Sequence, residues 1–157
     1  LVGAAAVILF IGVYYGVSGL IADLMLCFTM LIVMAGMGAF GATLTLPGIA
    51  GIVLTIGMAV DANVLIYERI REELRLGLTP LAAVRAGFDR AMVSITDANL
   101  TSIIVTVILY QFGTGPIRGF AVTLGLGIVA SMFTAIFVSR AIFEEWARHC
   151  GPKGLSI

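Results

Sequence analysis

Two copies of the tripeptide Asp-Ala-Asn, at residues 61–63 and 97–99, place a carboxyl group in strongly apolar surroundings. Asp61 is the only acidic or basic residue in the apolar segment 48–67. Inserting a carboxylate at the centre of a spanning helix costs about 2.5–3.5 kcal/mol, so such residues usually have a function. We expect Asp61 to bind a proton or an ion, or to pair with a partner. The alternative is a structural aspartate that is hydrogen-bonded to a neighbouring helix.

Asp97 lies near the start of a second apolar segment, 93–112. About one helical turn inside a span, its side chain can still reach the polar interface by snorkelling. A carboxylate near a helix N-terminus also interacts favourably with the helix dipole. We therefore predict a structural role for Asp97, with proton transfer as a secondary possibility.

The helical wheel predicts what surrounds Asp61. At 100° per residue, Gly57 and Leu65 share its face, together with Met58, Val64 and Glu68. Gly57 has no side chain and would let another helix approach closely beside the carboxyl group. Asn63 is predicted to point to a different face, towards Ala59 and Tyr67.

A partner for a charged Asp61 is not evident in this chain, because no Lys, Arg or His lies within its apolar spans. A buried charge without a partner is unfavourable. We therefore expect the partner to come from another subunit, on the face lined by Gly57. Alternatively, Asn99, Thr101 or Ser131 could satisfy the carboxyl group within the bundle.

These residues must be positioned by membrane helices. The chain has 157 residues, of which 61% are hydrophobic and 11% charged, whereas soluble domains have about 25% charged residues. The pattern predicts an all-α membrane bundle with an amphipathic helix at 79–92, capped by Thr79 and begun by Pro80. Breaks are predicted at 19–23, at 43–47, at Gly77 and at 113–119. Five spans remain, at about 1–18, 20–40, 48–67, 93–112 and 120–139.

Other chemistry is not indicated. The sequence shows no nucleotide-binding glycine-rich loop, no cluster of metal ligands and no nucleophile constellation. We therefore predict no catalytic residue, no metal site, no cofactor and no nucleic-acid partner. The two cysteines do not form a disulfide framework. The abrupt apolar start without Met favours a fragment of a longer protein.

The basic residues predict the orientation. Only Arg118 lies on one side of the five-span arrangement. The other eight of the nine basic residues fall on the opposite side, which is expected to be cytoplasmic together with the C-terminus. They are Arg69, Arg71, Arg75, Arg85, Arg90, Arg140, Arg148 and Lys153.

Two long runs resemble a known family. GIVLTIGMAVDANVLIYERIREEL (51–74) closely resembles the fourth membrane helix of the SecD family of bacterial protein-export subunits. SITDANLTSIIVTVILYQFGTGPIRGFAVTLGLGIVASMFTAI (94–136) is similar to the fifth and sixth helices, and the terminal GLSI also matches. The resemblance implies helices two to six of a half-bundle like those of resistance–nodulation–division (RND) transporters. The family's first helix and large periplasmic domain are absent from this sequence.

The resemblance also implies a function in the bacterial plasma membrane. Members pair with SecF and use the proton motive force to help preproteins leave the SecYEG channel. Asp61 matches the acidic residue to which proton transport is attributed. An RND-type, proton-driven exporter of small molecules or lipids would use the same device and is the main alternative. A scaffold that only stabilises a translocase is a third possibility, and it would tolerate Asp61→Asn.

Overall fold

The computed structural model describes residues 2–149, apart from the side chain of residue 4, and is helical nearly throughout this range. No strand occurs in it, which confirms the all-α prediction. The helices are α1 (Val2–Tyr15), α2 (Val17–Ala39), α3 (Leu46–Arg75), α4 (Pro80–Phe112) and α5 (Pro116–Phe133), followed by a π-helical segment (Thr134–Ser139) and α6 (Arg140–His149).

Four helical rods within residues 2–149 are long and apolar enough to cross a membrane: α2, α3, α4 and the continuous rod Pro116–His149. A membrane bundle is thereby confirmed. The first predicted span, 1–18, corresponds to α1, which has 14 residues. This is shorter than the roughly 20 residues that a bilayer core requires.

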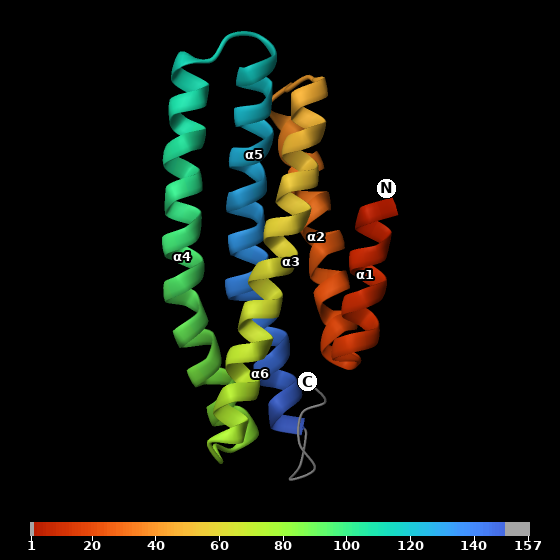
Figure 1. The fold of residues 1–157 in the computed structure, drawn as a ribbon, viewed down its shortest axis with the longest axis vertical. Coiled ribbons are helices and arrows are strands. Elements are labelled where there is room, and N and C mark those ends of the chain that lie inside the picture. Colours follow the sequence, from red (N-terminus) through yellow and green to blue (C-terminus); the bar gives the residue numbers. More distant parts are fainter. Residues whose placement is uncertain (1, 150–157) are drawn as a thin grey trace.

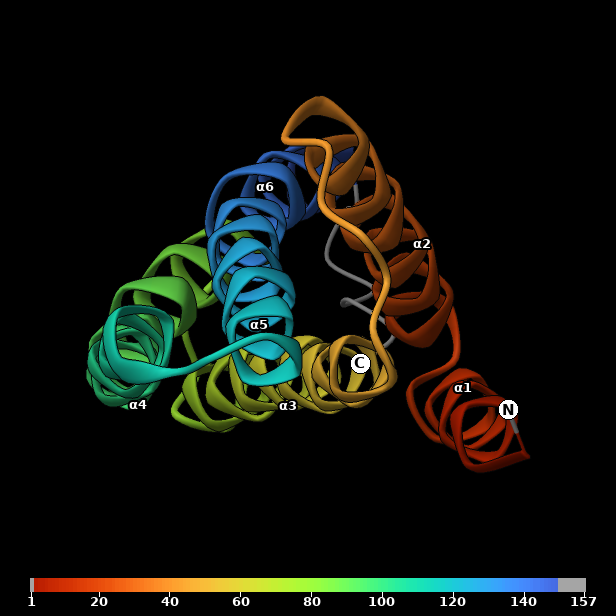
Figure 2. The ribbon, with the colours of Figure 1, turned by 90° about the horizontal axis from the view of Figure 1, so that it is seen from above.

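Helix α5 is the centre of the bundle. It packs against α2, α3 and α4, whereas α1 packs mainly against α2 at the edge (Figures 1 and 2). Small and hydroxylated side chains permit the close contacts. A methyl group at Gly127 of α5 would collide with Thr55 of α3. The Thr29 and Thr134 hydroxyls, from α2 and the π-helical segment, are hydrogen-bonded at 2.6 Å.

Several helix ends lie where the sequence predicts them. The Thr45 hydroxyl accepts a hydrogen bond from the Gly48 amide and caps α3, with Pro47 in the first turn. Gly77 has a φ of 87° just after α3, the left-handed conformation that glycine adopts readily. Thr79 is the N-cap residue of α4, and Pro80 is its first residue.

Helix α4 corrects the prediction of a separate amphipathic helix at 79–92. Residues 80–112 form one continuous helix, because no proline or turn sequence separates the two parts. The buried stripe that includes Val84 and Phe88 continues through Ile95. Gly87 lets this stripe approach α3 so closely that a methyl group there would lie 2.8 Å from the Ile70 amide nitrogen.

Two predicted turns are also misplaced. The chain turns at Gly16, with a φ of 55°, and not at 19–23, so Asp23 lies inside α2. Gly19 packs against the backbone of Ile11 and joins α1 to α2 closely. At the other end of the bundle, α5 already begins at Pro116, within the predicted loop 113–119.

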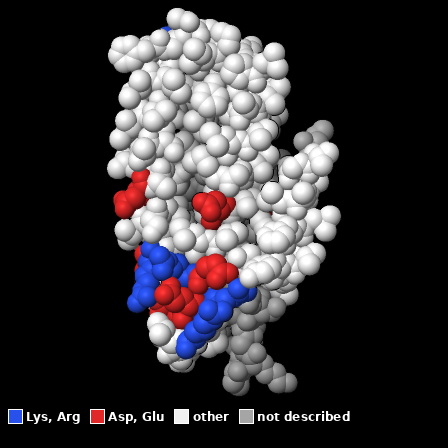
Figure 3. All heavy atoms as spheres, viewed as in Figure 1, with Lys and Arg blue, Asp and Glu red and all other residues white. Residues whose placement is uncertain are grey.

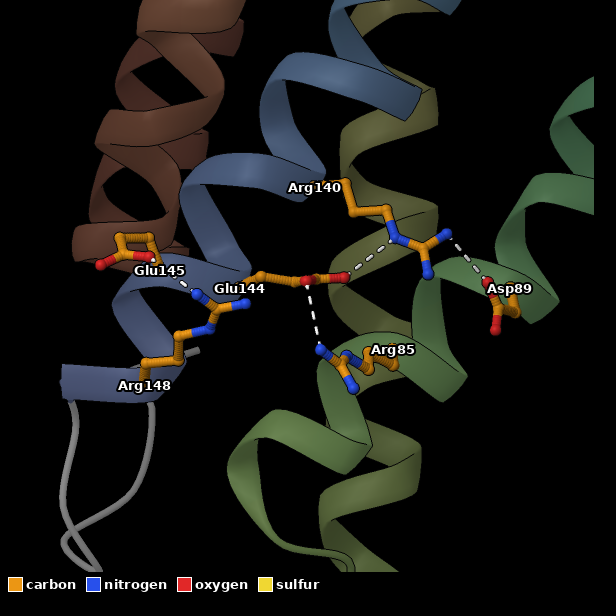
Figure 4. A network of polar contacts seen from close by, with 6 residues as sticks. All are labelled: Arg85, Asp89, Arg140, Glu144, Glu145 and Arg148. Carbon is orange, nitrogen blue, oxygen red and sulfur yellow. Dashed lines mark hydrogen bonds and ion pairs between the residues drawn. The ribbon is translucent and has the colours of Figure 1, made fainter.

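Charged side chains gather at one end of the bundle (Figure 3). There, Arg140 pairs with Asp89 of α4 at 2.9 Å and with Glu144 of its own helix at 3.1 Å, while Arg85 contacts Glu144 at 3.6 Å (Figure 4). These pairs join α6 to α4. Arg118 lies at the start of α5, at the opposite end, and Lys153 lies outside the described residues.

Candidate functional site in the membrane bundle

Asp61 lies in the middle of α3, on the outer face of the bundle, and is exposed. Within residues 2–149 its carboxyl group has no hydrogen bond and no ion pair. The nearest basic residue along the helix, Arg69, is eight positions away, or about 12 Å. Its guanidinium pairs with Glu72 at 3.0 Å instead. The carboxyl group is thus uncompensated by this part of the chain.

A shallow, open groove lies along one face of α3 beside Asp61, and all of its lining residues belong to that helix. Its other lining residues are small or apolar: Ala50, Val53, Leu54, Gly57 and Met58. A methyl group at Gly57 would meet no atom within 4 Å. Gly57 thus lies on the same open face of α3 as Asp61. This face has the shape and the apolar surface that suit close contact with another membrane helix.

A second hollow, of about 230 Å³, lies between α3 and α4 and also includes Asp61. Its polar lining comes from α4: Ser94, Asn99 and Ser102. Ser102 lies one helical turn after Asn99, and Ser94 lies about two turns before Ser102; neither serine is among the predicted site residues. The signal that could have found them is their place on the α4 face that meets Asp61.

The three residues predicted as possible hydrogen-bond partners of Asp61 do not bond to it. Asn99 lines the hollow beside Asp61, but its amide donates to the Ile95 carbonyl at 2.8 Å. Thr101 is exposed and donates to the Asp97 carbonyl, and Ser131 donates to the Ile128 carbonyl. All three thus bond to their own helices. Satisfaction of Asp61 within the bundle, the alternative stated above, has no support in these contacts.

Asn63 faces away from Asp61, as the wheel predicts. It is buried, with 2% exposure, and its amide nitrogen donates to the Ala59 carbonyl at 3.0 Å. Its side-chain oxygen is also buried and has no hydrogen-bond partner. Asn63 therefore belongs to the interior of the bundle and does not take part in the groove.

Asp97 is exposed on α4, but the predicted location near a helix N-terminus is wrong. Because α4 begins at Pro80, Asp97 lies about 26 Å along the helix. The dipole of the first turn does not reach that far. Asp97 lines neither of the hollows beside Asp61.

With this geometry established, known proteins show where the chain belongs. The profile of the family described as "Protein export membrane protein SecD/SecF, C-terminal" matches residues 1–149. The chain belongs to the SecD/SecF family of protein-export membrane proteins. A protein translocase subunit SecD from Syntrophobacter fumaroxidans is 66% identical over the whole chain, and one from Calditerrivibrio nitroreducens is 58% identical.

A solved structure of the family has the same fold. The crystal structure of SecDF, a translocon-associated membrane protein from Thermus thermophilus, superimposes with a TM-score of 0.90 at 46% identity. It covers 94% of this chain, which in turn covers 21% of that protein. The chain likewise spans 30% of the length of the two SecD relatives named above.

Proposed function

We propose that this chain is the proton-coupled membrane part of a SecD-type subunit of the protein-export machinery. The observation that carries the proposal is the Asp61 carboxyl group, which lies in an apolar span without a cation and opens into a groove beside Gly57. Intramembrane carboxylates in this setting commonly bind protons. Similarity to translocase subunits favours protein export over the export of small molecules or lipids.

In this proposal Asp61 takes up a proton from one side of the membrane and releases it to the other. The change of charge alters the packing of α3 against whatever fills the groove. A membrane potential supplies about 2.3 kcal/mol per charge per 100 mV. This is comparable to the roughly 2.5–3.5 kcal/mol cost of placing a carboxylate in the membrane, which a potential of about 110–150 mV would match. No cofactor takes part.

SecF would occupy the groove beside Asp61. The SecYEG translocon and the preprotein would contact the full-length protein. The protein is expected in the bacterial plasma membrane, with its C-terminus in the cytoplasm. The charged end of the bundle supports this orientation, because seven of the eight basic residues predicted to be cytoplasmic lie within the described residues and belong to α3, α4 and α6. Arg118 belongs to the opposite end.

Export assays with the full-length protein and SecF test the function. Asp61→Asn keeps the size and polarity of the side chain but cannot ionise. We expect it to abolish the stimulation of preprotein release by the proton motive force, with insertion and assembly unchanged. Asp97→Asn is the matched control and is expected to have a smaller effect. Stimulation of normal size in Asp61→Asn would refute proton coupling at this residue.

A further inference from the structure

Asp23 is a second carboxyl group inside an apolar span. It is the seventh residue of α2 (Val17–Ala39), is half-buried, and lies against Gly12 of α1. Within residues 2–149 it makes no hydrogen bond and no ion pair. A carboxyl group inside an apolar span is costly, and the function proposed above does not use Asp23.

The neighbours of Asp23 come from α1 and α3. It lies against Gly12, where a methyl group would come to 3.6 Å from the Asp23 Oδ2 atom. From α3, the Tyr67 side chain is close enough for an electrostatic interaction with the Asp23 carboxyl group. Tyr67 is fully buried, with 0% exposure, and its hydroxyl has no hydrogen-bond partner among the described residues. Buried tyrosine hydroxyls usually have a partner.

Aromatic and polar contacts connect Tyr67 with the charged end of the bundle. The rings of Tyr67 and Tyr15 pack edge to face, with 5.6 Å between centroids. The Tyr15 hydroxyl donates to Glu68 at 3.0 Å. Glu68 pairs with Arg71 at 3.0 Å, and 45% of its side chain is exposed. Glu68 is therefore in contact with the solution at the charged end of the bundle.

Among the described residues, the titratable groups near this position come from two of the helices packed against α2. Helix α1 contributes Tyr14 and Tyr15, and α3 contributes Tyr67, Glu68 and Arg71. The π-helical segment contains no titratable residue, and the only charged residue of α5, Arg118, lies at the far end.

From this arrangement we propose that Asp23 is a second proton-binding site in the membrane, with the Tyr67 hydroxyl as its hydrogen-bond partner. A proton from the solution near Glu68 adds to the Asp23 carboxylate and gives the neutral carboxyl group. In the proposed site the Tyr67 hydroxyl binds this carboxyl group, directly or through a bridging water. The site is separate from Asp61, because Tyr67 lies six residues on, about 9 Å along α3 and 240° around it.

Infrared spectra of the full-length protein with SecF in lipid membranes, recorded as a function of pH, test the proposal. A protonated carboxyl group has its own C=O stretching band. We expect a pH-dependent band that Asp23→Asn removes and that Asp61→Asn leaves in place. Tyr67→Phe keeps the buried ring and removes the hydroxyl, so it should shift the frequency of this band. Tyr14→Phe, on an exposed neighbour, is the matched control and should not shift it.

Two results would overturn the proposal. One is a set of spectra that Asp23→Asn leaves unchanged at every pH, because Asp23 then does not titrate. The other is an unshifted band in Tyr67→Phe, which decides the matter even if Asp23→Asn fails to fold. A failure of Asp61→Asn to change preprotein export would refute the proposed function and would leave the Asp23 site unaffected. The two proposals can therefore fail independently.

Discussion

Asp61 and Asn63 stand two residues apart on α3 and lie in opposite surroundings. Asn63 is buried and hydrogen-bonded within its own helix, whereas Asp61 is exposed beside an open groove. The 100° spacing of helical residues explains the difference, and the sequence was sufficient to predict it. The side chain that is costly in a membrane thus faces outward, where no described residue forms a hydrogen bond or ion pair with it.

Crosslinking from single residues beside Asp61 tests whether SecF contacts this face of α3. A photo-activatable maleimide on Gly57→Cys or Leu65→Cys, in full-length protein without Cys27 and Cys150, should attach to a membrane helix of SecF. Both residues share the face of Asp61. Ala59→Cys is the matched control, since Ala59 is 3% exposed and should react only within the chain. If Gly57→Cys and Leu65→Cys also react only within the chain, or with lipid, the groove is not the SecF contact.

At the scale of helices, α3 and α4 form a long antiparallel pair that depends on one glycine. Gly87 lets α4 approach the backbone of Ile70, and Arg90 of α4 forms an ion pair with Glu73 of α3 at 2.6 Å. Glu73 is almost wholly buried, with a 4% exposed side chain. Removing one partner of such a pair leaves a buried charge. The contact holds together the helices that carry Asp61 and Asn99.

Gly87→Ala should separate α3 from α4. The added methyl group would come within 3.0 Å of the Ile70 backbone, which cannot move aside as a flexible side chain can. We expect a loss of about 1–3 kcal/mol in the free energy of unfolding, measured in detergent micelles. Gly38→Ala, where a methyl group meets nothing within 4 Å, is the control and should change stability by less than about 0.5 kcal/mol. Equal stability of the two variants would contradict the close packing.

The helix boundaries show which structural features the sequence could predict. Pro47, Gly77 and Pro80 mark boundaries through backbone chemistry, and the structure has boundaries there. The amphipathic pattern of 79–92 predicts a separate helix, but this prediction is wrong. A change from polar to apolar composition does not by itself end a helix. The turn at Gly16 was missed because several glycines are spaced closely there, and only one adopts a positive φ.

At the scale of the whole molecule, charge is segregated to one end of the bundle (Figure 3). Ion pairs link α6 to α4 there, while the rest of the outer surface is largely apolar. Exposed surface pairs contribute little stability individually, so this end is better explained by contact with water and by orientation in the membrane. The polar lining from Ser94 and Ser102 became evident only at this scale, because it depends on how α3 and α4 pack.

Thiol labelling tests the orientation. Thr79→Cys and Thr114→Cys are matched substitutions at exposed positions at opposite ends of the bundle. In intact cells, an impermeant reagent should label residue 114 and not residue 79. Labelling of residue 79 alone would reverse the proposed topology.

Proton movement through Asp61 is the central claim. The measurement is proton flux across membrane vesicles that contain the full-length protein and SecF, under an imposed pH gradient and during preprotein export. The wild-type protein should show a flux that rises with export, and Asp61→Asn should reduce it to the level of vesicles without the protein. Asp97→Asn should retain most of it. A flux in Asp61→Asn equal to that of the wild type would contradict the claim.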